Sequence, residues 1–286
     1  MSGNRLHGLA DYLVTGLAAL WYLLDGRHRE VARSNLKFAY GRELSPRARE
    51  RLALGVFRHF IRYAGELIEL LVFPLFFIKR KVIVIGMENL EAAMALGLGA
   101  IIIGAHAGNW EYTVMGAGVK YNTPVAVVAR ELDDTLGRFL FRYLRQRGGN
   151  RMVDREKGLK EILRHLKRKR IVGILIDQNT PTKGGLLVDF FGKPARTTPV
   201  AALLARHRDI PVLPGFSRRL ADGRHLLALF PAIPMEKTAD PEADVQRHLE
   251  LQSQALEAWV RTCPQQWLWI HRRWKNQFPE IYERRK

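Results

Sequence analysis

Apolar and polar positions over the first 80 residues repeat at the spacing of α-helices. Leucines recur every three or four residues between Leu6 and Leu24, which places them on one face of a helix. A second helical pattern covers residues 45–71, where Ser45 is suited to cap the N-terminus and Pro46 to occupy the first turn. The pattern therefore predicts a helical region over residues 1–80.

From residue 82 the pattern changes to short, nearly continuous apolar runs that alternate with helical segments. Such runs are typical of strands buried on both faces, as in a mainly parallel sheet with helices on both sides. The expected strands cover residues 82–86, 100–106, 124–130, 171–177, 210–216 and 225–233. The expected helices cover residues 88–97, 133–148, 155–169 and 242–262. Because "SRRLADGR" (217–224) is typical of a hairpin turn, the α/β domain predicted over residues 81–286 has a mixed sheet.

Two apolar segments have features of membrane contact. The leucine-rich segment is marginal in length for a span, and "DGRHRE" follows it instead of a small-residue cleavage site. We interpret it as an uncleaved anchor or a helix lying in the interface, with a core helix of a soluble protein as the alternative. Residues 67–86 are interrupted by a proline and contain the basic cluster 79–81. They suit docking on anionic headgroups, or equally a buried helix followed by a strand.

The composition is strongly basic, with 46 Lys and Arg against 28 Asp and Glu, a formal net charge of +18. This charge fits a nucleic acid, an anionic membrane surface or an acidic protein as partner. The basic residues are spread along helices and form no helix-turn-helix, zinc or RRM signature, so we expect no nucleic-acid binding, and a non-enzymatic binder of nucleic acid or another polyanion is only a remote alternative. The single cysteine, Cys263, excludes an intrachain disulfide and a cysteine zinc site, and it favours a reducing compartment.

Three predicted strands each end in polar residues. His106 follows "AIIIGA", Asp177 and Gln178 follow "IVGILI", and Arg130 follows "PVAVVA". Sites in open α/β sheets form outside the carboxyl ends of the strands. The sequence therefore predicts a functional site at this edge of the sheet.

The stretch "AIIIGAHAGNWEY" (100–112) carries the main candidate chemistry. Gly104 and Gly108 allow a tight turn, and Asn109 is suited to cap a helix that starts with "WEY". Glu111 would then lie in the first helical turn, within reach of His106. A carboxylate bonded to one ring nitrogen fixes the tautomer and stabilises the imidazolium, which leaves the other nitrogen to act as a general base.

No serine or cysteine near His106 offers a nucleophile, so such a base would activate a substrate hydroxyl or a water molecule. The spacing also differs from the His-Glu-x-x-His of zinc proteases. Taken alone, His-x₄-Glu occurs by chance, and a purely structural pair remains the alternative. If Glu111 serves the histidine, Glu111→Gln is expected to lower turnover at least about 10-fold and to shift Tm by only a few degrees.

The motif "HAGNWE" (106–111) resembles the H-x₄-D/E block of the lysophospholipid acyltransferase superfamily. It is most similar to the branch of bacterial lipid A late acyltransferases, the lauroyl and myristoyl transferases. The resemblance extends over nearly the whole chain and departs only at "FAYG", where the branch continues Phe-Pro. The other similar blocks are "EVARSNLKFAY", "ARELDDTLGRFLFRYLRQRGG", "IVGILIDQN", "VDFFGKPARTTP" and "QQWLWIHRRWK".

This resemblance implies a glycerol-3-phosphate acyltransferase-like fold and an O-acyltransferase without metal, cofactor or covalent acyl-enzyme. His106 would deprotonate the acceptor hydroxyl, which attacks an acyl thioester, and Glu111 would orient and charge-balance His106. The donor would be acyl carrier protein or acyl-coenzyme A, and the acceptor a phosphorylated lipid A precursor. A lysophospholipid or another glycolipid is the alternative acceptor. The location implied is the cytoplasmic face of a bacterial inner membrane.

The residues expected to bind substrate are Gly108, Asn109, Trp110, Arg130, Asp177, Gln178, Phe191, Gly192 and Arg196. Backbone N–H groups of residues 108–110 are candidate donors to the thioester oxyanion. Arg130 suits a phosphate, or is a solvated loop residue. Asp177 and Gln178 could hold a sugar or orient Arg130, or simply cap a strand end. Phe191, beside Phe190, could wall an acyl groove or roof the core, and Arg196 lies in a turn suited to hold a phosphate.

The C-terminal block combines tryptophans with basic side chains. Trp267, Trp269 and Trp274 lie close to Arg272, Arg273 and Lys275. This combination suits a membrane interface. The alternative is a C-terminal strand of a soluble domain that packs two of the tryptophans inward.

Overall fold

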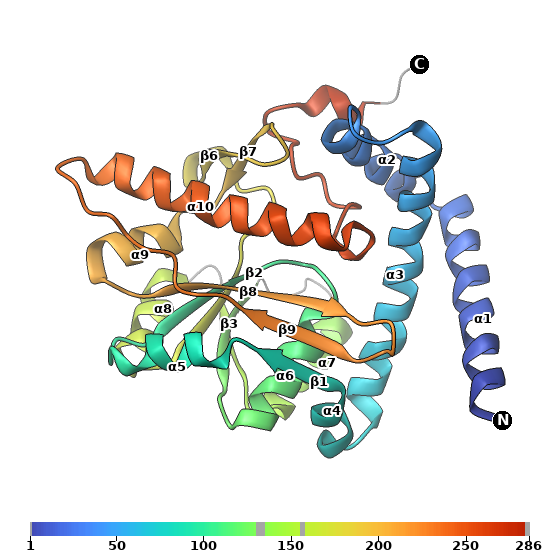
Figure 1. Cartoon of the computed structure of the whole chain (residues 1–286), viewed down its shortest axis with the longest axis horizontal. Helices are drawn as coiled ribbons and strands as arrows, with labels where there is room; N and C mark the ends of the chain where they lie inside the picture. Colours follow the sequence, from blue (N-terminus) through green and yellow to red (C-terminus); the bar gives the residue numbers. More distant parts are fainter. Residues whose placement is uncertain (1, 130–134, 155–157, 284–286) are drawn as a thin grey trace.

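The computed structural model describes residues 2–129, 135–154 and 158–283. Over these residues the chain forms ten α-helices, a seven-stranded sheet and a separate two-stranded hairpin (Figure 1). The helices are α1 (Ser2–Leu24), α2 (Gly26–Tyr40), α3 (Pro46–Val72), α4 (Leu75–Lys81), α5 (Met87–Ala95), α6 (Trp110–Tyr121), α7 (Thr135–Arg147), α8 (Gly158–Lys167), α9 (Val200–Arg208) and α10 (Pro241–Thr262). The strands are β1 (Val82–Ile85), β2 (Ala100–Gly104), β3 (Val125–Ala129), β4 (Arg151–Asp154), β5 (Ile171–Leu175), β6 (Leu186–Asp189), β7 (Pro194–Thr197), β8 (Val212–Arg219) and β9 (His225–Leu229).

The main sheet has the strand order β1-β9-β8-β2-β5-β3-β4. Strands β8, β2, β5, β3 and β4 are parallel to one another, whereas β9 is antiparallel to β8 and parallel to β1. This confirms the prediction of a mainly parallel, mixed α/β sheet with a β8–β9 hairpin. The sequence pattern did not predict β4 or the β6–β7 hairpin, because their short runs carry charged residues.

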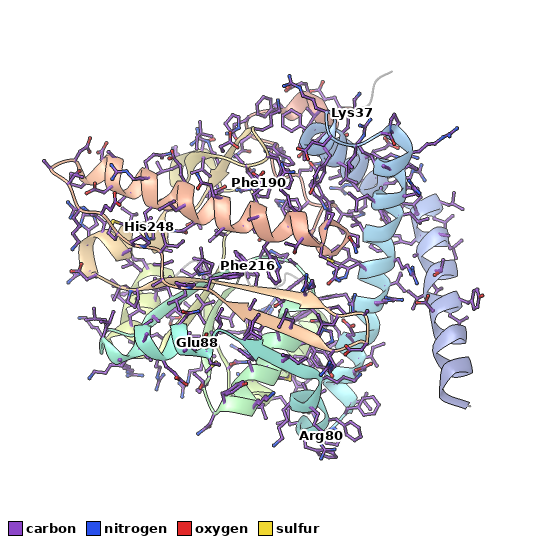
Figure 2. The ribbon with its side chains drawn as sticks, in the orientation of Figure 1. Lys37, Arg80, Glu88, Phe190, Phe216 and His248 are labelled. Atoms are coloured by element: carbon purple, nitrogen blue, oxygen red, sulfur yellow. The ribbon has the colours of Figure 1, made fainter. Side chains whose placement is uncertain are left out.

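Alternate residues of β2 show how the sheet separates two environments. Ile101 and Ile103 belong to the largest hydrophobic cluster, which includes residues of α9, α10 and the C-terminal segment. Ile102 and Gly104 instead line a cavity on the opposite face. Figure 1 shows α10 on one side of the sheet and α5 and α6 on the other, and Figure 2 shows Phe216 of β8 between the sheet and α10. Helices therefore cover both faces, as the buried strands predicted.

Helix α3 begins where the sequence predicted. Ser45 Oγ accepts a hydrogen bond from the Ala48 N–H, and Pro46 opens α3. Helix α1 packs along α3 and buries Tyr22 against Phe57, while Leu17 on its outer side is exposed. One hydrophobic cluster joins these helices to the sheet. The boundary at residue 80 between a helical region and an α/β domain therefore stays a prediction from the sequence.

Among the helices of the described residues, none has an apolar stretch that could cross a bilayer. Over residues 67–86 the chain forms the end of α3, then α4 and β1, which matches the alternative of a helix followed by a strand. The same segment nevertheless exposes Phe73, Phe76 and Phe77. The helix and strand of this segment are therefore compatible with contact between its exposed phenylalanines and a membrane.

The C-terminal tryptophans lie in the core. Trp267, Trp269 and Trp274 are each at most 1% exposed, and Trp267 and Trp269 pack edge to face. The alternative of inward packing is therefore correct and the membrane interface is wrong for these side chains, because Phe190 and Phe191 cover them. The segment forms turns where this alternative expected a strand. Arg273 is buried beside them and donates hydrogen bonds to the backbone oxygens of Gln178 and Arg196.

Candidate active site

The loop between β2 and α6 is held in one conformation by a cap and a close backbone contact. Asn109 Oδ1 accepts a hydrogen bond from the Tyr112 N–H at 2.9 Å, which confirms the predicted N-cap. Gly108 has a positive φ of 60°, and a Cβ at this position would lie 2.8 Å from the backbone of Arg218. Only glycine fits such a position, so the loop can lie directly against β8.

His106 is paired with Asp177, whereas the sequence spacing predicted Glu111. The His106 Nδ1 lies 2.7 Å from Asp177 Oδ1, and the His106 N–H donates to Asp177 Oδ2 at 2.8 Å. The strand register explains this pairing, because Gly104 of β2 lies beside Leu175 of β5 and both chains continue two residues further. With Nδ1 engaged, Nε2 is the ring nitrogen left for a substrate, and Gln178 Nε2 lies 3.4 Å from it.

Asp177 is held as a buried anion. It is 1% exposed, and Trp267 Nε1 donates a hydrogen bond to its Oδ2 at 2.8 Å. Burial raises the pKa of Asp177, but attraction to His106 and the hydrogen bonds from His106 and Trp267 outweigh burial and lower it to about 2. The carboxylate is thus charged at neutral pH and able to stabilise an imidazolium at His106.

Glu111 has a different partner from the one expected. Both of its carboxylate oxygens lie 3.1 Å from Arg145 Nε, and Arg145 Nη2 also binds Glu111 Oε1. The pair is buried and ties the first turn of α6 to the last turn of α7. The pKa of the neighbouring Tyr63 is raised well above its ordinary value, mainly by burial and secondly by repulsion from the Glu111 charge. The corrected role of Glu111 is therefore to anchor a helix beside the site.

A third carboxylate, the partly buried one of Glu66, holds the cap of α6. Glu66 Oε2 accepts a hydrogen bond from Asn109 Nδ2 at 2.8 Å, and the Glu66 carboxylate forms an ion pair with Arg219 of β8. Arg219 Nη1 also lies 2.9 Å from His59 Nδ1. Sequence reasoning missed this group, because its members come from α3, α6 and β8 and follow no spacing rule.

One expected oxyanion donor is already engaged inside the protein. The Gly108 N–H donates to the Gln266 oxygen at 3.0 Å, and Gln266 is further bonded to the backbone of Arg219. Its N–H is therefore removed from the set of donors predicted for residues 108–110. The position of Gly108 is instead structural, since it joins the loop to the C-terminal segment.

His106 lines a cavity of about 680 Å³ between the sheet and α6. Its polar lining includes Glu111, Arg145 and Gln178, and the ring of Trp110 lies 4.9 Å from that of His106. Most of the remaining lining is apolar. Glycines on three neighbouring strands hollow the face of the sheet, and the apolar side chains around them include Val84, Met87, Leu90, Ile102, Val127, Leu227 and Leu229. The three glycines are Gly104, Gly173 and Gly215.

Three of the predicted substrate-binding residues lie away from this cavity. Phe191 packs against Tyr40 and Trp269, and with Gly192 it borders a separate pocket beside α2. The core-packing alternative for Phe191 is therefore correct. Arg196 lies in β7 and donates to the Gly185 oxygen at 2.8 Å, outside the lining of the His106 cavity. Arg130 lies outside the described residues.

The site offers hydrogen-bonding groups and an apolar wall to a ligand. In the part of the chain that the structure describes, no group of three or more His, Cys, Asp or Glu side chains converges on a position for a metal ion. The residues of the cavity lining that are suited to contact a ligand are His106, Trp110 and Gln178, together with the apolar side chains.

Fold and site define a mixed α/β protein with a histidine–aspartate pair at adjacent strand ends, beside an apolar cavity. A family model described as "Bacterial lipid A biosynthesis acyltransferase" matches residues 7–276. The chain belongs to this family.

Named relatives agree with this assignment. The chain is 27% identical over 190 residues to a lipid A biosynthesis acyltransferase of Haemophilus influenzae, which covers 65% of this chain and 57% of the relative. It is 28% identical over 195 residues to the lipid A biosynthesis lauroyltransferase of Escherichia coli K12, covering 68% and 61%. It is 31% identical over 137 residues to a phosphatidylinositol mannoside acyltransferase of Mycobacterium tuberculosis, covering 45% and 42%. These alignments span less than two thirds of each relative.

Proposed function

We propose that the protein transfers a fatty acyl group from a thioester to a hydroxyl group of a lipid A precursor. The observation that carries the proposal is the buried Asp177 on Nδ1 of His106, which leaves Nε2 for the substrate at the edge of an apolar cavity. A histidine oriented in this way is a general base for a substrate hydroxyl. Family membership and the names of the relatives support acyl transfer.

In the proposed reaction the proton of the acceptor hydroxyl moves to His106 Nε2 while its oxygen attacks the thioester carbonyl. The tetrahedral intermediate collapses with cleavage of the C–S bond, and the departing thiolate takes the proton back from His106. Asp177 keeps the ring in one tautomer and stabilises the imidazolium. No residue of the protein is acylated.

The cavity suits the acyl chain. Its floor is formed where Gly104, Gly173 and Gly215 leave space on neighbouring strands, and apolar side chains surround this space. Burying methylene groups there contributes about 0.8 kcal/mol each. Trp110 and Gln178, which flank His106, are proposed to contact the reacting groups.

The basic charge supports acidic partners for donor and acceptor. Acyl carrier protein is the proposed donor, with acyl-coenzyme A as the alternative, and a phosphorylated acceptor fits the same net charge of +18. A second candidate function is transfer to another glycolipid or a lysophospholipid. The similarity to a phosphatidylinositol mannoside acyltransferase favours the glycolipid form of this alternative.

We propose that the protein acts at the cytoplasmic face of a bacterial inner membrane. The exposed leucines of α1 would lie in the interface, and the positive charge would be attracted to anionic lipids. No nucleic acid is proposed as partner.

The proposal is tested by mass spectrometry of lipids from cells with and without the protein, together with assays of purified protein on thioester donors. His106→Ala is expected to lower acyl transfer ~10²–10⁴-fold. The matched control is His207→Ala, because His207 is an exposed histidine on α9. Unchanged lipids in the cells, or wild-type turnover by His106→Ala, would contradict the proposal.

A further inference from the structure

A set of exposed apolar side chains lies on three helices around the candidate site. They come from the end of α3, from the segment that contains α4, and from α7. Each is at least 45% exposed. We call these residues the rim surface: Ile68, Val72, Phe73, Phe76, Phe77, Phe139 and Tyr143.

Hydrogen bonds join the parts of the rim surface. Arg147, at the end of α7, donates to the backbone oxygens of Leu70 at 2.5 Å, Leu71 at 3.1 Å and Phe73 at 2.6 Å. Residues four apart lie on one side of a helix, so Phe139 and Tyr143 share the side of α7 that carries Arg147. The exposed aromatic residues of α7 and those around Phe73 are therefore parts of one continuous surface.

The opposite sides of α3 and α7 wall the cavity, whereas α4 does not line it and packs Ile78 against α6. Phe141 and Arg145 of α7 line it, and Arg145 binds Glu111 in the first turn of α6. Tyr63 of α3 also lines it and stacks on Trp110 with ring centroids 4.6 Å apart. The α3 and α7 parts of the rim surface are thus the outer side of the wall beside His106, and α4 continues this surface over α6.

Cations accompany these apolar residues. Helix α4 buries Ile78 but exposes Phe76, Phe77, Lys79 and Arg80. Figure 2 shows Arg80 at the lower end of the molecule, where Figure 1 places α4 next to the end of α3. Aromatic side chains next to Lys and Arg are typical of protein surfaces that lie in the headgroup region of anionic membranes.

We propose that the rim surface docks on an anionic lipid bilayer and holds the wall of the cavity against the membrane. The inference rests on the proposed function in one respect. If the acceptor is a lipid, docking of the rim surface supplies the route by which this lipid reaches His106. A bilayer is the occupant that matches the surface. Exposed rings lie on α4, on α7 and at the C-cap of α3, cations lie beside those of α4, and the chain carries a net charge of +18. The surface adds a second contact to that of α1.

The test measures the depth of single positions in vesicles of phosphatidylglycerol and phosphatidylethanolamine. Phe77→Cys and Phe139→Cys, each in a Cys263→Ala background, carry a bimane label, and the vesicles contain lipids with a nitroxide on the acyl chain. Apolar residues of interfacial helices lie about 5–10 Å inside the headgroup boundary, so both labels should lose most of their emission. A label at Leu96→Cys, on an exposed position at the end of α5, should keep its emission.

The charge is tested separately by vesicle flotation. Lys79→Gln/Arg80→Gln should weaken binding to the anionic vesicles up to roughly 30-fold, since each cation near such a surface contributes about 1 kcal/mol. The matched control is Lys167→Gln/Arg168→Gln, two exposed cations at the end of α8, which should bind like wild type.

Several outcomes overturn the proposal. Quenching of a label at Leu17→Cys on α1, without quenching at residues 77 and 139, would show that α1 alone contacts the membrane. A change in emission at residue 139 that follows protein concentration in the absence of vesicles would assign the surface to a second copy. No step of this test requires acyl transfer. Membrane docking can therefore be confirmed or contradicted even if the proposed enzymatic function is wrong.

Discussion

Two buried carboxylate pairs flank the start of α6, and they differ in the partner that each carboxylate holds. Asp177 binds His106, which can gain and lose a proton, whereas Glu111 binds Arg145, which is always charged. The first pair can change its charge during a reaction. The second has a fixed charge and joins two helices. Chemistry is therefore expected from the pair that is distant in sequence.

Strand register explains why the distant carboxylate binds the histidine. Parallel pairing of β2 with β5 brings positions 71 apart to the same level of the sheet, as Gly104 beside Leu175 and then His106 beside Asp177. Glu111 lies in the first turn of α6 instead, and its side chain binds Arg145 of α7. The five-residue spacing of His106 and Glu111 therefore did not identify the partner of the histidine.

The largest effect on rate is expected from Asp177→Asn. The amide lacks the charge that stabilises an imidazolium, and its NH₂ group favours the wrong tautomer at Nδ1, so acyl transfer should fall ~10²–10⁴-fold. The measurement is kcat of the purified, folded variant. Asp244→Asn serves as control, because Asp244 is an equally buried carboxylate that binds Arg206 away from the cavity. Wild-type turnover in Asp177→Asn would contradict the assignment of the His106–Asp177 pair as the catalytic one.

Glu111→Gln is expected to act mainly on stability. Removing one partner of a buried ion pair leaves the Arg145 charge uncompensated and costs about 3–5 kcal/mol in the free energy of unfolding. This reverses the expectation from sequence, which placed the effect on turnover. The double variant Glu111→Gln/Arg145→Met should recover part of the loss in a urea titration. A stable Glu111→Gln protein with a larger loss of kcat than Asp177→Asn would reverse the assignment of the pairs.

The smallest effect concerns a histidine without a carboxylate partner. Burial lowers the pKa of His271 to about 4, and its Nδ1 is buried without a hydrogen bond within the described chain. The unfolded histidine has a pKa of about 6.5, so the unfolded state binds more protons between pH 6.5 and about 4. Stability is therefore complete above pH 6.5 and falls as the pH is lowered toward about 4.

His271→Gln should remove about 1–2 kcal/mol of the difference in unfolding free energy between pH 7 and pH 5. Urea titrations of both proteins at these two pH values measure it. His207→Gln, at an exposed position, should leave the difference unchanged. An identical pH dependence in His271→Gln and wild type would show that other groups cause it.

The sequence predicted the sheet, the cap at Asn109 and the position of His106, because each depends on local pattern and turn chemistry. It also placed Asp177 at a strand end of the same edge, but strand order was needed to bring the two side chains together. The roles of Arg145 and Glu66 follow from helix packing, which no spacing rule encodes. Phe191 was misassigned because an apolar pair on a loop looks alike whether it covers the core or a ligand.

The contact between the β2–α6 loop and the C-terminal segment has a consequence for synthesis. Gln266 accepts the Gly108 N–H, and Trp267 donates to Asp177. During translation the sheet edge that carries His106 leaves the ribosome more than 150 residues before these partners, a delay of about 8–30 s at 5–20 residues per second. A nascent chain therefore has its histidine long before the carboxylate is fixed, and the candidate site becomes complete only after residues 266 and 267 have been made.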